Sequence, residues 1–406
     1  MKKLASLIAL LVAIQFAHVL DFVMMLPLGP RLQAELHLTP ARFATLVSAY
    51  TFAAGIVGFV GAFFIDRFDR KQALLLLFAG FIGGTAWCGL ANGFGGLMIA
   101  RILAGAFGGI VGSLVTAIVA DVVPPQDRGK ALGFVMAAFP IASVLGIPLA
   151  LYITQHLGWK APFLLLAGLS VGIWVLVWAF APALRGHLMR QERRSLPTEV
   201  VGRVLQSRGQ LLGLGLMCTQ VFGHFTLVPL LSTYMMRNVG LQEGQLSLIY
   251  IVGGLLQFGT NPATGWLADR FGRAQMFLII CFTSTVPIWL ISHLPPIPLW
   301  QVLIVTGMFF VFSGSRFIPA MALINDQVDA RHRGSYMGFI SCVQQVSSGL
   351  ASYVAGWLVY EGATKLAPIG GYERVGYWCL AFTAVSAVIS WFLRRPGVAQ
   401  HAVPVG

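Results

Sequence analysis

Three charged side chains lie well inside long apolar stretches, and they are the first candidates for chemistry. Asp21 is the only carboxylate in such a position, and Arg101 and Arg316 are the only Lys or Arg residues there. An isolated charge inside a bilayer is costly, so each of these side chains is a functional candidate by default. With a helical rise of about 1.5 Å per residue, Asp21 and Arg101 lie roughly 10 Å and 9 Å from the same side of the membrane. They therefore share one depth.

A carboxylate at this depth can bind and release a proton, because burial and a neighbouring guanidinium act on its ionisation in opposite directions. His18 lies three residues before Asp21, on the same helix face, and histidine can relay protons near neutral pH. We therefore predict a proton-coupling group of Asp21, Arg101 and His18. The alternative is a permanent structural bridge between Asp21 and Arg101, with His18 serving in packing or contacting the solute.

Arg316 is separated from Asp21 by roughly 15 Å in depth, calculated from the same helical rise. Without an acidic partner in its own layer, its guanidinium would bind water, backbone carbonyls or an anionic group of a solute. The alternative is an Arg that braces its own helix.

Other polar and soft apolar side chains in the apolar stretches could line a solute pocket. His224 follows Phe222 as His18 follows Phe16, which repeats one pattern in both halves of the chain. Each candidate could instead be ordinary helix packing. The predicted solute-binding set is Gln15, Met25, Gln220, His224, Tyr250, Asn261, Phe310, Arg316 and Gln344.

The chain carries no Walker motif, catalytic triad or metal-ligand spacing, and its five cysteines all fall in apolar runs. Cysteines in such runs are typical of small core residues. We therefore expect no enzymatic activity, no cofactor and no metal.

The elements that must position these residues follow from composition. Of 406 residues, 57% are hydrophobic and 10% are charged, against roughly 25% charged in soluble proteins. This excludes an ordinary soluble domain, and the high hydrophobicity excludes disorder. Because a membrane-spanning helix takes about 20 residues, the chain is predicted to be an all-α integral membrane protein of twelve helices. The stretches are 4–28, 43–65, 73–92, 95–120, 131–154, 161–182, 210–234, 244–267, 274–292, 299–324, 335–358 and 375–393.

The net charge of +13 is explained by topology. With a cytoplasmic N-terminus, 19 of the 27 Lys and Arg residues fall on the cytoplasmic side, 6 fall outside and 2 lie inside helices. This bias is the positive-inside pattern. We expect both termini in the cytoplasm of a bacterium, a chain embedded in the inner membrane, and no nucleic-acid partner. The first stretch follows Lys2 and Lys3, but it is too long for a signal peptide, so we expect a retained helix.

Two loop motifs occur twice. Asp121-Val-Val-Pro-Pro-Gln-Asp-Arg128-Gly129 and Asp326-Gln-Val-Asp-Ala-Arg-His-Arg333-Gly334 are offset by 205 residues, and Asp66-Arg67-Phe68-Asp69-Arg70 and Asp269-Arg270-Phe271-Gly272-Arg273 by 203. Repeats of this kind predict two pseudo-symmetric six-helix bundles with a solute site between them. The predicted boundaries are 1–182 and 210–393 for the bundles, 183–209 for a cytoplasmic linker and 394–406 for a cytoplasmic tail.

These loops resemble those of the major facilitator superfamily. Its signature Gly-x-Leu-Ala-Asp-Arg-x-Gly-Arg-Lys is matched nearly throughout by Gly265-Trp-Leu-Ala-Asp269-Arg270-Phe-Gly272-Arg273. The resemblance implies a monomer that moves a small molecule by alternating access. It also implies that loop charges form a gate latch, although they could simply anchor helices at the headgroups. The expected gating residues are Asp66, Arg67, Arg70, Asp121, Arg128, Asp269, Arg270, Arg273, Asp326 and Arg333.

Within that family, Asp21-Phe-Val-Met-Met-Leu-Pro-Leu-Gly29-Pro30 resembles a pattern of drug:proton antiporters, with Gly29 where Leu is usual. The stretch Ala142-Ser143-Val-Leu-Gly146-Ile-Pro148 is similar to an antiporter signature, but it lacks the usual tandem Gly-Pro. The resemblance implies proton-coupled efflux of a small lipophilic or sugar-like solute. Alternatives are an importer or uniporter of an organic anion, and a lipid-handling flippase or a membrane receptor that does not transport.

Overall fold

The computed structural model describes residues 2–65, 68–124, 127–182, 184, 197–329, 333–362 and 367–393. The predicted gating residues Asp66 and Arg67 lie outside the described residues, as do residues 183 and 185–196 of the predicted linker and the whole predicted tail. The helix containing Arg333 is described, but the side chain of Arg333 is not.

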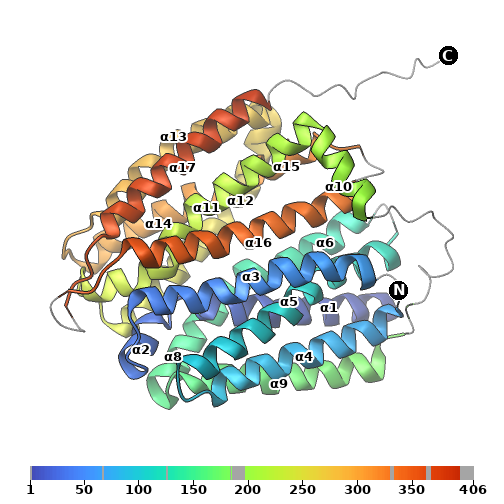
Figure 1. Cartoon of the computed structure of the whole chain (residues 1–406), viewed down its shortest axis with the longest axis horizontal. Helices are drawn as coiled ribbons and strands as arrows, with labels where there is room; N and C mark the ends of the chain where they lie inside the picture. The colour runs from blue at the N-terminus through green and yellow to red at the C-terminus, as the bar shows by residue number, and fades with distance from the viewer. Residues whose placement is uncertain are drawn as a thin grey trace.

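The N-terminal half consists of long helices that run along the long axis of the molecule (Figure 1). Its elements are α1 (Lys2–Met24), α2 (Gly29–Glu35), α3 (Pro40–Phe64), α4 (Arg70–Leu90), α5 (Phe94–Val122), α6 (Arg128–Met136), α7 (Ala138–Ile141), η2 (Ala142–Gly146), α8 (Ile147–Leu157) and α9 (Lys160–Phe180).

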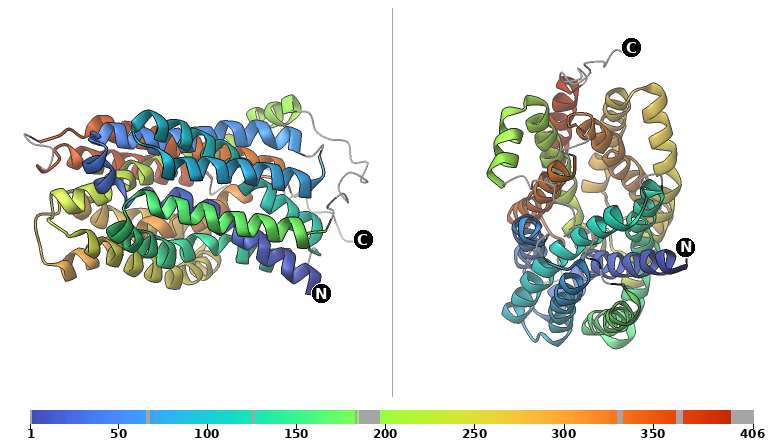
Figure 2. Two further views of the ribbon diagram at one scale, coloured as in Figure 1. Left: turned by 90° about the horizontal axis from the view of Figure 1, so that it is seen from below. Right: turned by 90° about the vertical axis from the view of Figure 1, so that its right-hand side faces the viewer.

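The C-terminal half has the same plan, preceded by a short helix. Its elements are α10 (Pro197–Gln206), α11 (Arg208–Arg237), α12 (Glu243–Phe271), α13 (Arg273–Ser292), α14 (Leu299–Ser315), α15 (Phe317–Asn325), α16 (Arg333–Leu358) and α17 (Tyr372–Phe392). α1 begins and α17 ends at one end of the molecule, here called the terminal end, and α2 lies at the opposite end (Figures 1 and 2). The predicted all-helical fold of two six-helix bundles is confirmed.

Two of the predicted helices contain a local break in the α-helical pattern, although each remains one candidate membrane span. The fifth spanning unit is divided into α6, α7, the π-helical turn η2 and α8, and the tenth is divided at Arg316 into α14 and α15. Proline has no N–H to donate to the carbonyl four residues earlier. Pro140, Pro148 and Pro319 leave the carbonyls of Met136, Val144 and Ser315 without that bond, and each carbonyl lies at or beside a break.

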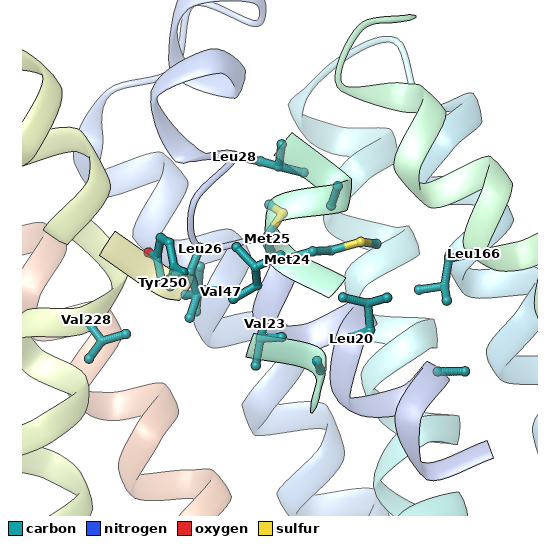
Figure 3. Packing of buried hydrophobic residues seen from close by; sticks show 14 of the residues in the cluster. Leu20, Val23, Met24, Met25, Leu26, Leu28, Val47, Leu166, Val228 and Tyr250 are labelled. Atoms are coloured by element: carbon teal, nitrogen blue, oxygen red, sulfur yellow. The ribbon is translucent and has the colours of Figure 1, made fainter. Parts of the chain in front are cut away.

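The first predicted stretch also differs from the structure. α1 ends at Met24, four residues before the predicted limit, and a turn over residues 25–28 leads into α2. This turn is tightly packed. Figure 3 shows Met24, Met25 and Leu26 in a buried apolar cluster that also includes Val228 and Tyr250 from the C-terminal half.

The two halves meet along two pairs of helices. α3 packs against α16 from Ala44, beside Gly356, to Phe59, whose ring centroid lies 4.8 Å from that of Phe339. α12 packs against η2 and α8. Among the described residues, ten helices are apolar enough to cross a membrane, and α12 and α16 are not among them. Both are interface helices, which are shielded from lipid on one side and so tolerate more polar residues.

Polar side chains add to the contact between the halves at the α2 end. At the α2 end, the Gln33 side chain donates a hydrogen bond of 2.8 Å to Thr233 of α11, and both residues are buried. Arg31 lies 3.5 Å from Glu243 of α12. Towards the terminal end, α6 packs on α1 and α5 of its own half. The α2 end is therefore closed by direct contact between the halves.

Candidate functional site

Asp21 and Arg101 are brought together in the core of the N-terminal half. Nη1 of Arg101 lies 3.0 Å from Oδ2 of Asp21, and both side chains are fully buried. Thr85 of α4 donates a hydrogen bond of 3.0 Å to the other carboxylate oxygen. Two donors on two further helices thus hold one carboxylate of α1. The pairing of Asp21 with Arg101 agrees with their equal depths along α1 and α5.

Tyr50 of α3 covers this pair and was not predicted from the sequence. The guanidinium carbon of Arg101 lies 4.2 Å from the centroid of the Tyr50 ring, a cation–π geometry. A tyrosine in an apolar helix has no distinguishing sequence signal. The one available hint was Gly105, against which the backbone of Tyr50 packs directly.

A row of small residues on α5 makes room beside this pair. Arg101, Gly105, Gly108 and Gly112 are spaced by four, three and four residues, so they share one helix face. His18 lies against Gly108 and Gly112. Glycines at these positions allow α1 and α3 to approach α5 closely.

Several polar atoms next to this glycine row are buried without a hydrogen-bond partner in the described part of the chain. They are Oε1 of Gln15, both ring nitrogens of His18 and the hydroxyl of Tyr50. Buried polar groups normally find a partner, which can be ordered water. The cluster therefore has free capacity to bind water or the hydroxyl groups of a solute.

Arg316 lies in the corresponding core of the C-terminal half, but its partners are neutral. Its guanidinium donates hydrogen bonds to the hydroxyls of Thr383 (2.6 Å) and Ser313 (2.9 Å), and it lies at the break between α14 and α15. No ion pair involves Arg316 within the described ranges. These contacts favour a guanidinium that braces the interrupted helix against α17.

His224 adjoins this cluster. Its Nδ1 lies 3.1 Å from the hydroxyl of Ser313, and its ring stacks on Phe309 with 5.7 Å between centroids. Both His18 and His224 therefore lie deep in their halves, as the repeated pattern predicts. They differ in that His18 has no bonded partner among the described residues, whereas His224 is held by Ser313.

The remaining predicted solute-binding residues are dispersed. Both amide atoms of Gln220 and the amide oxygen of Asn261 are buried and have no partner among the described residues. The Tyr250 hydroxyl lies 2.8 Å from that of Ser232, and the Phe310 ring stands edge-on to Tyr250. Gln344 is partly buried on α16. Met25 is fully buried in the apolar cluster and presents no surface to a solute in this structure.

The described gating residues pair within each half. Nε of Arg70 lies 3.1 Å from Asp121, joining the start of α4 to the end of α5. Arg273 pairs in the same way with Asp326, and lies 3.7 Å from Asp269. Arg128 donates to the carbonyl of Val123, and the Arg270 guanidinium lies over the Trp266 ring. These pairs join helices of the same half, and the latch between the halves stays a prediction.

Comparison with known proteins adds a family and a fold. The family model described as Major Facilitator Superfamily matches residues 11–222 and 212–405. An uncharacterized MFS-type transporter, YwfA of Bacillus subtilis (strain 168), is 26% identical over 380 residues, covering 90% of this chain and 86% of that protein. A probable sugar efflux transporter of Helicobacter pylori (strain G27) is 27% identical over 246 residues, covering 59% of this chain and 61% of that protein.

Solved structures resemble the fold over nearly the whole chain. An inward-facing, occupied bacterial homolog of the human lysosomal transporter Spinster has a TM-score of 0.78 at 14% identity and covers 98% of both chains. A D-xylose-proton symporter has a TM-score of 0.74 at 16% identity and covers 97% of this chain and 98% of its own.

Proposed function

The chain belongs to the Major Facilitator Superfamily, and from this premise we propose that it exports a small lipophilic or sugar-like solute in exchange for protons. As a member of that family it is a multi-pass membrane transporter and not an enzyme. Its substrate is a small molecule, and alternating exposure of a site between the two halves would move it across the membrane.

The observation that supports proton coupling is the fully buried Asp21, held by Arg101 and Thr85. A carboxylate inside a membrane bundle marks an ion or proton pathway more often than a structural contact. His18 lies on the same face of α1, and its ring nitrogens have no partner in the described residues. It would connect Asp21 to water on the side of the terminal end.

We infer the solute class from buried polar groups that have no partner among the described residues and from aromatic rings at the contact between the halves. The unpartnered polar atoms of Gln15, Gln220 and Asn261 are amides, which can bind hydroxyl or amide groups. Aromatic rings of both halves, such as Phe22 and Phe225, approach each other nearby. The relative from Helicobacter pylori is named a probable sugar efflux transporter, and this mixture of polar and aromatic groups suits a sugar.

The alternative of an organic anion depends on Arg316 as its recognition group. All of its nitrogens are bonded to neutral protein groups, so binding an anion there would first require breaking those contacts. This favours the proposed neutral or lipophilic solute. Neither a lipid-handling flippase nor a receptor without transport is favoured by a specific contact among the described residues.

Everted membrane vesicles test the exchange. Respiration acidifies their interior, and an exported solute added outside should enter in exchange for protons, dissipating the gradient followed by an acridine dye. We expect dissipation with one or more members of a panel of sugars and lipophilic solutes, selected by thermal stabilisation of the purified protein. Vesicles lacking the protein are the control. Uptake of a stabilising solute without proton movement would contradict antiport.

The proposed orientation places the terminal end in the cytoplasm of a bacterial cell, with the chain as a monomer in the inner membrane. It rests on the distribution of 19 Lys and Arg residues against 6. Leu205→Cys, at an exposed position on α10, should react with an impermeant maleimide only in everted vesicles. Pro296→Cys, in the exposed loop between α13 and α14 at the α2 end, should react only in intact cells. Reversal of this pattern would overturn the orientation.

A further inference from the structure

A continuous row of aromatic and charged groups runs from the C-terminal half to Asp21. The Phe225 ring of α11 lies 6.1 Å from the Phe22 ring of α1, across the interface between the halves. Phe22 stacks on Tyr50 with 5.5 Å between centroids. Tyr50 in turn covers the guanidinium of Arg101, which is paired with Asp21.

Tyr50 is the central member of this row. It is 1% exposed, and it forms a small apolar cluster with Ala54 and Ala104, against which Phe22 packs, separate from the two main cores. Its backbone is fixed by direct packing against Gly105. Its ring lies against the rings of Phe22 and His18 and against the Arg101 guanidinium.

Arg101 depends on few groups for its position. Nη1 bonds to the carboxylate and to the backbone carbonyl of Asp21, whereas Nε and Nη2 are buried without a partner among the described residues. The face of the Tyr50 ring also attracts the guanidinium, and the Cys88 side chain lies beside it. A displacement of that ring therefore acts directly on the contact that stabilises the Asp21 carboxylate.

We propose that Tyr50 is a positioning residue for proton coupling, because it transmits the contact between the two halves to the Asp21–Arg101 pair. This rests on the proposed function, in which Asp21 holds the coupled proton. When the halves rock apart at this level, Phe225 withdraws from Phe22, and the stack of Phe22 on Tyr50 loses its support. The Tyr50 ring then tilts, the guanidinium shifts, and Asp21 changes its hold on the proton.

The test compares Tyr50→Leu with Tyr50→Phe. Leu removes the ring that faces Arg101, whereas Phe keeps the ring and removes only the hydroxyl. In proteoliposomes, Tyr50→Leu should lower solute accumulation driven by a pH gradient by about thirtyfold, as expected for losing a desolvated cation–π contact. Solute–solute exchange should remain close to wild type. Tyr50→Phe should preserve both activities. The measured ratio of protons to solute falls if transport is uncoupled, whereas a loss of folded protein lowers both fluxes and leaves their ratio unchanged.

A second variant keeps the inference testable if Tyr50→Leu does not fold. Phe225→Leu lies in the other half and leaves Tyr50, Arg101 and Asp21 in place. Like Tyr50→Leu, it should lower the proton-to-solute ratio, but by a smaller amount. In a double-mutant comparison the two substitutions should be non-additive, because they interrupt one path.

The outcomes separate this inference from the proposed function. If Asp21→Asn uncouples transport while Tyr50→Leu and Phe225→Leu retain the wild-type proton-to-solute ratio, the aromatic row is ordinary packing and the inference is wrong. If Tyr50→Leu does not fold, the test rests on Phe225→Leu. The inference is then wrong if Phe225→Leu keeps the wild-type proton-to-solute ratio. If Asp21→Asn still accumulates solute against a gradient, the proposed function fails, and the inference fails with it.

Discussion

Asp21→Asn is expected to abolish solute accumulation driven by a proton gradient, while solute–solute exchange survives. Asparagine keeps the shape of the side chain and an oxygen that accepts from Thr85 or Arg101, but it cannot ionise. In solute–solute exchange the transporter returns with solute bound and releases no proton. Exchange therefore does not require an ionisable side chain at position 21. Both activities are measured in proteoliposomes with radiolabelled solute, with and without an imposed pH gradient. Asp329→Asn, at an exposed position in the loop after α15, is the control and should change neither.

The same substitution also leaves Arg101 buried without a counter-charge. Removing one partner of a buried ion pair typically costs about 3–5 kcal/mol, and the Tyr50 ring offsets part of this cost. We therefore expect a lower melting temperature. Combining Asp21→Asn with Arg101→Met removes the unpaired charge and should restore part of that stability without restoring coupling. Undiminished accumulation by Asp21→Asn would show that the coupled proton is held elsewhere, with His18 and His224 as the next candidates.

Gly105→Ala is expected to destabilise the N-terminal half strongly. A methyl group there would overlap the backbone carbonyl of Tyr50, and a backbone atom cannot move aside as a flexible side chain can. Overpacking of a tight core costs about 1–3 kcal/mol and sometimes more. The measurement is the melting temperature of detergent-purified protein, together with the fraction that elutes as a monodisperse peak.

Gly112→Ala is the matched control, because it lies on the same face of the same helix. The nearest atom to its added methyl group would be Cε1 of His18 at 3.4 Å, an ordinary contact with a side chain. It should melt close to wild type. Equal effects of the two substitutions would mean that α3 and α5 are not in contact at Tyr50 as described.

The depth argument for Asp21 and Arg101 succeeded because the helical rise is nearly constant, so position along a spanning helix can be calculated from residue number alone. The rotation of a helix about its axis cannot be calculated so easily. Tyr50 was therefore missed, since only the packing of α3 on α5 places its ring over Arg101. For Arg316 the sequence left carbonyl groups and a solute open, and the hydroxyl partners come from α14 and α17.

Helix breaks show a similar limit. Pro140, Pro148 and Pro319 accompany breaks, whereas Pro229, Pro262 and Pro287 lie inside continuous helices. A proline always removes one backbone hydrogen bond, but tertiary packing decides whether the helix separates there. The repeated loop motifs correctly indicated charged pairs at helix ends, yet their sequence did not reveal that Arg70 and Arg273 reach partners within their own halves.

The two halves share their pairs at the helix ends but not their deep charges. Arg70–Asp121 and Arg273–Asp326 occupy repeated positions, whereas the position 205 residues after Arg101 is Thr306. An ancestor of two identical halves would have carried either two carboxylates at the level of Asp21 or none. The present chain has one, so the pseudo-symmetry that relates the halves does not carry Asp21 onto a second carboxylate. The repeated architecture therefore leaves the two halves chemically different in their cores.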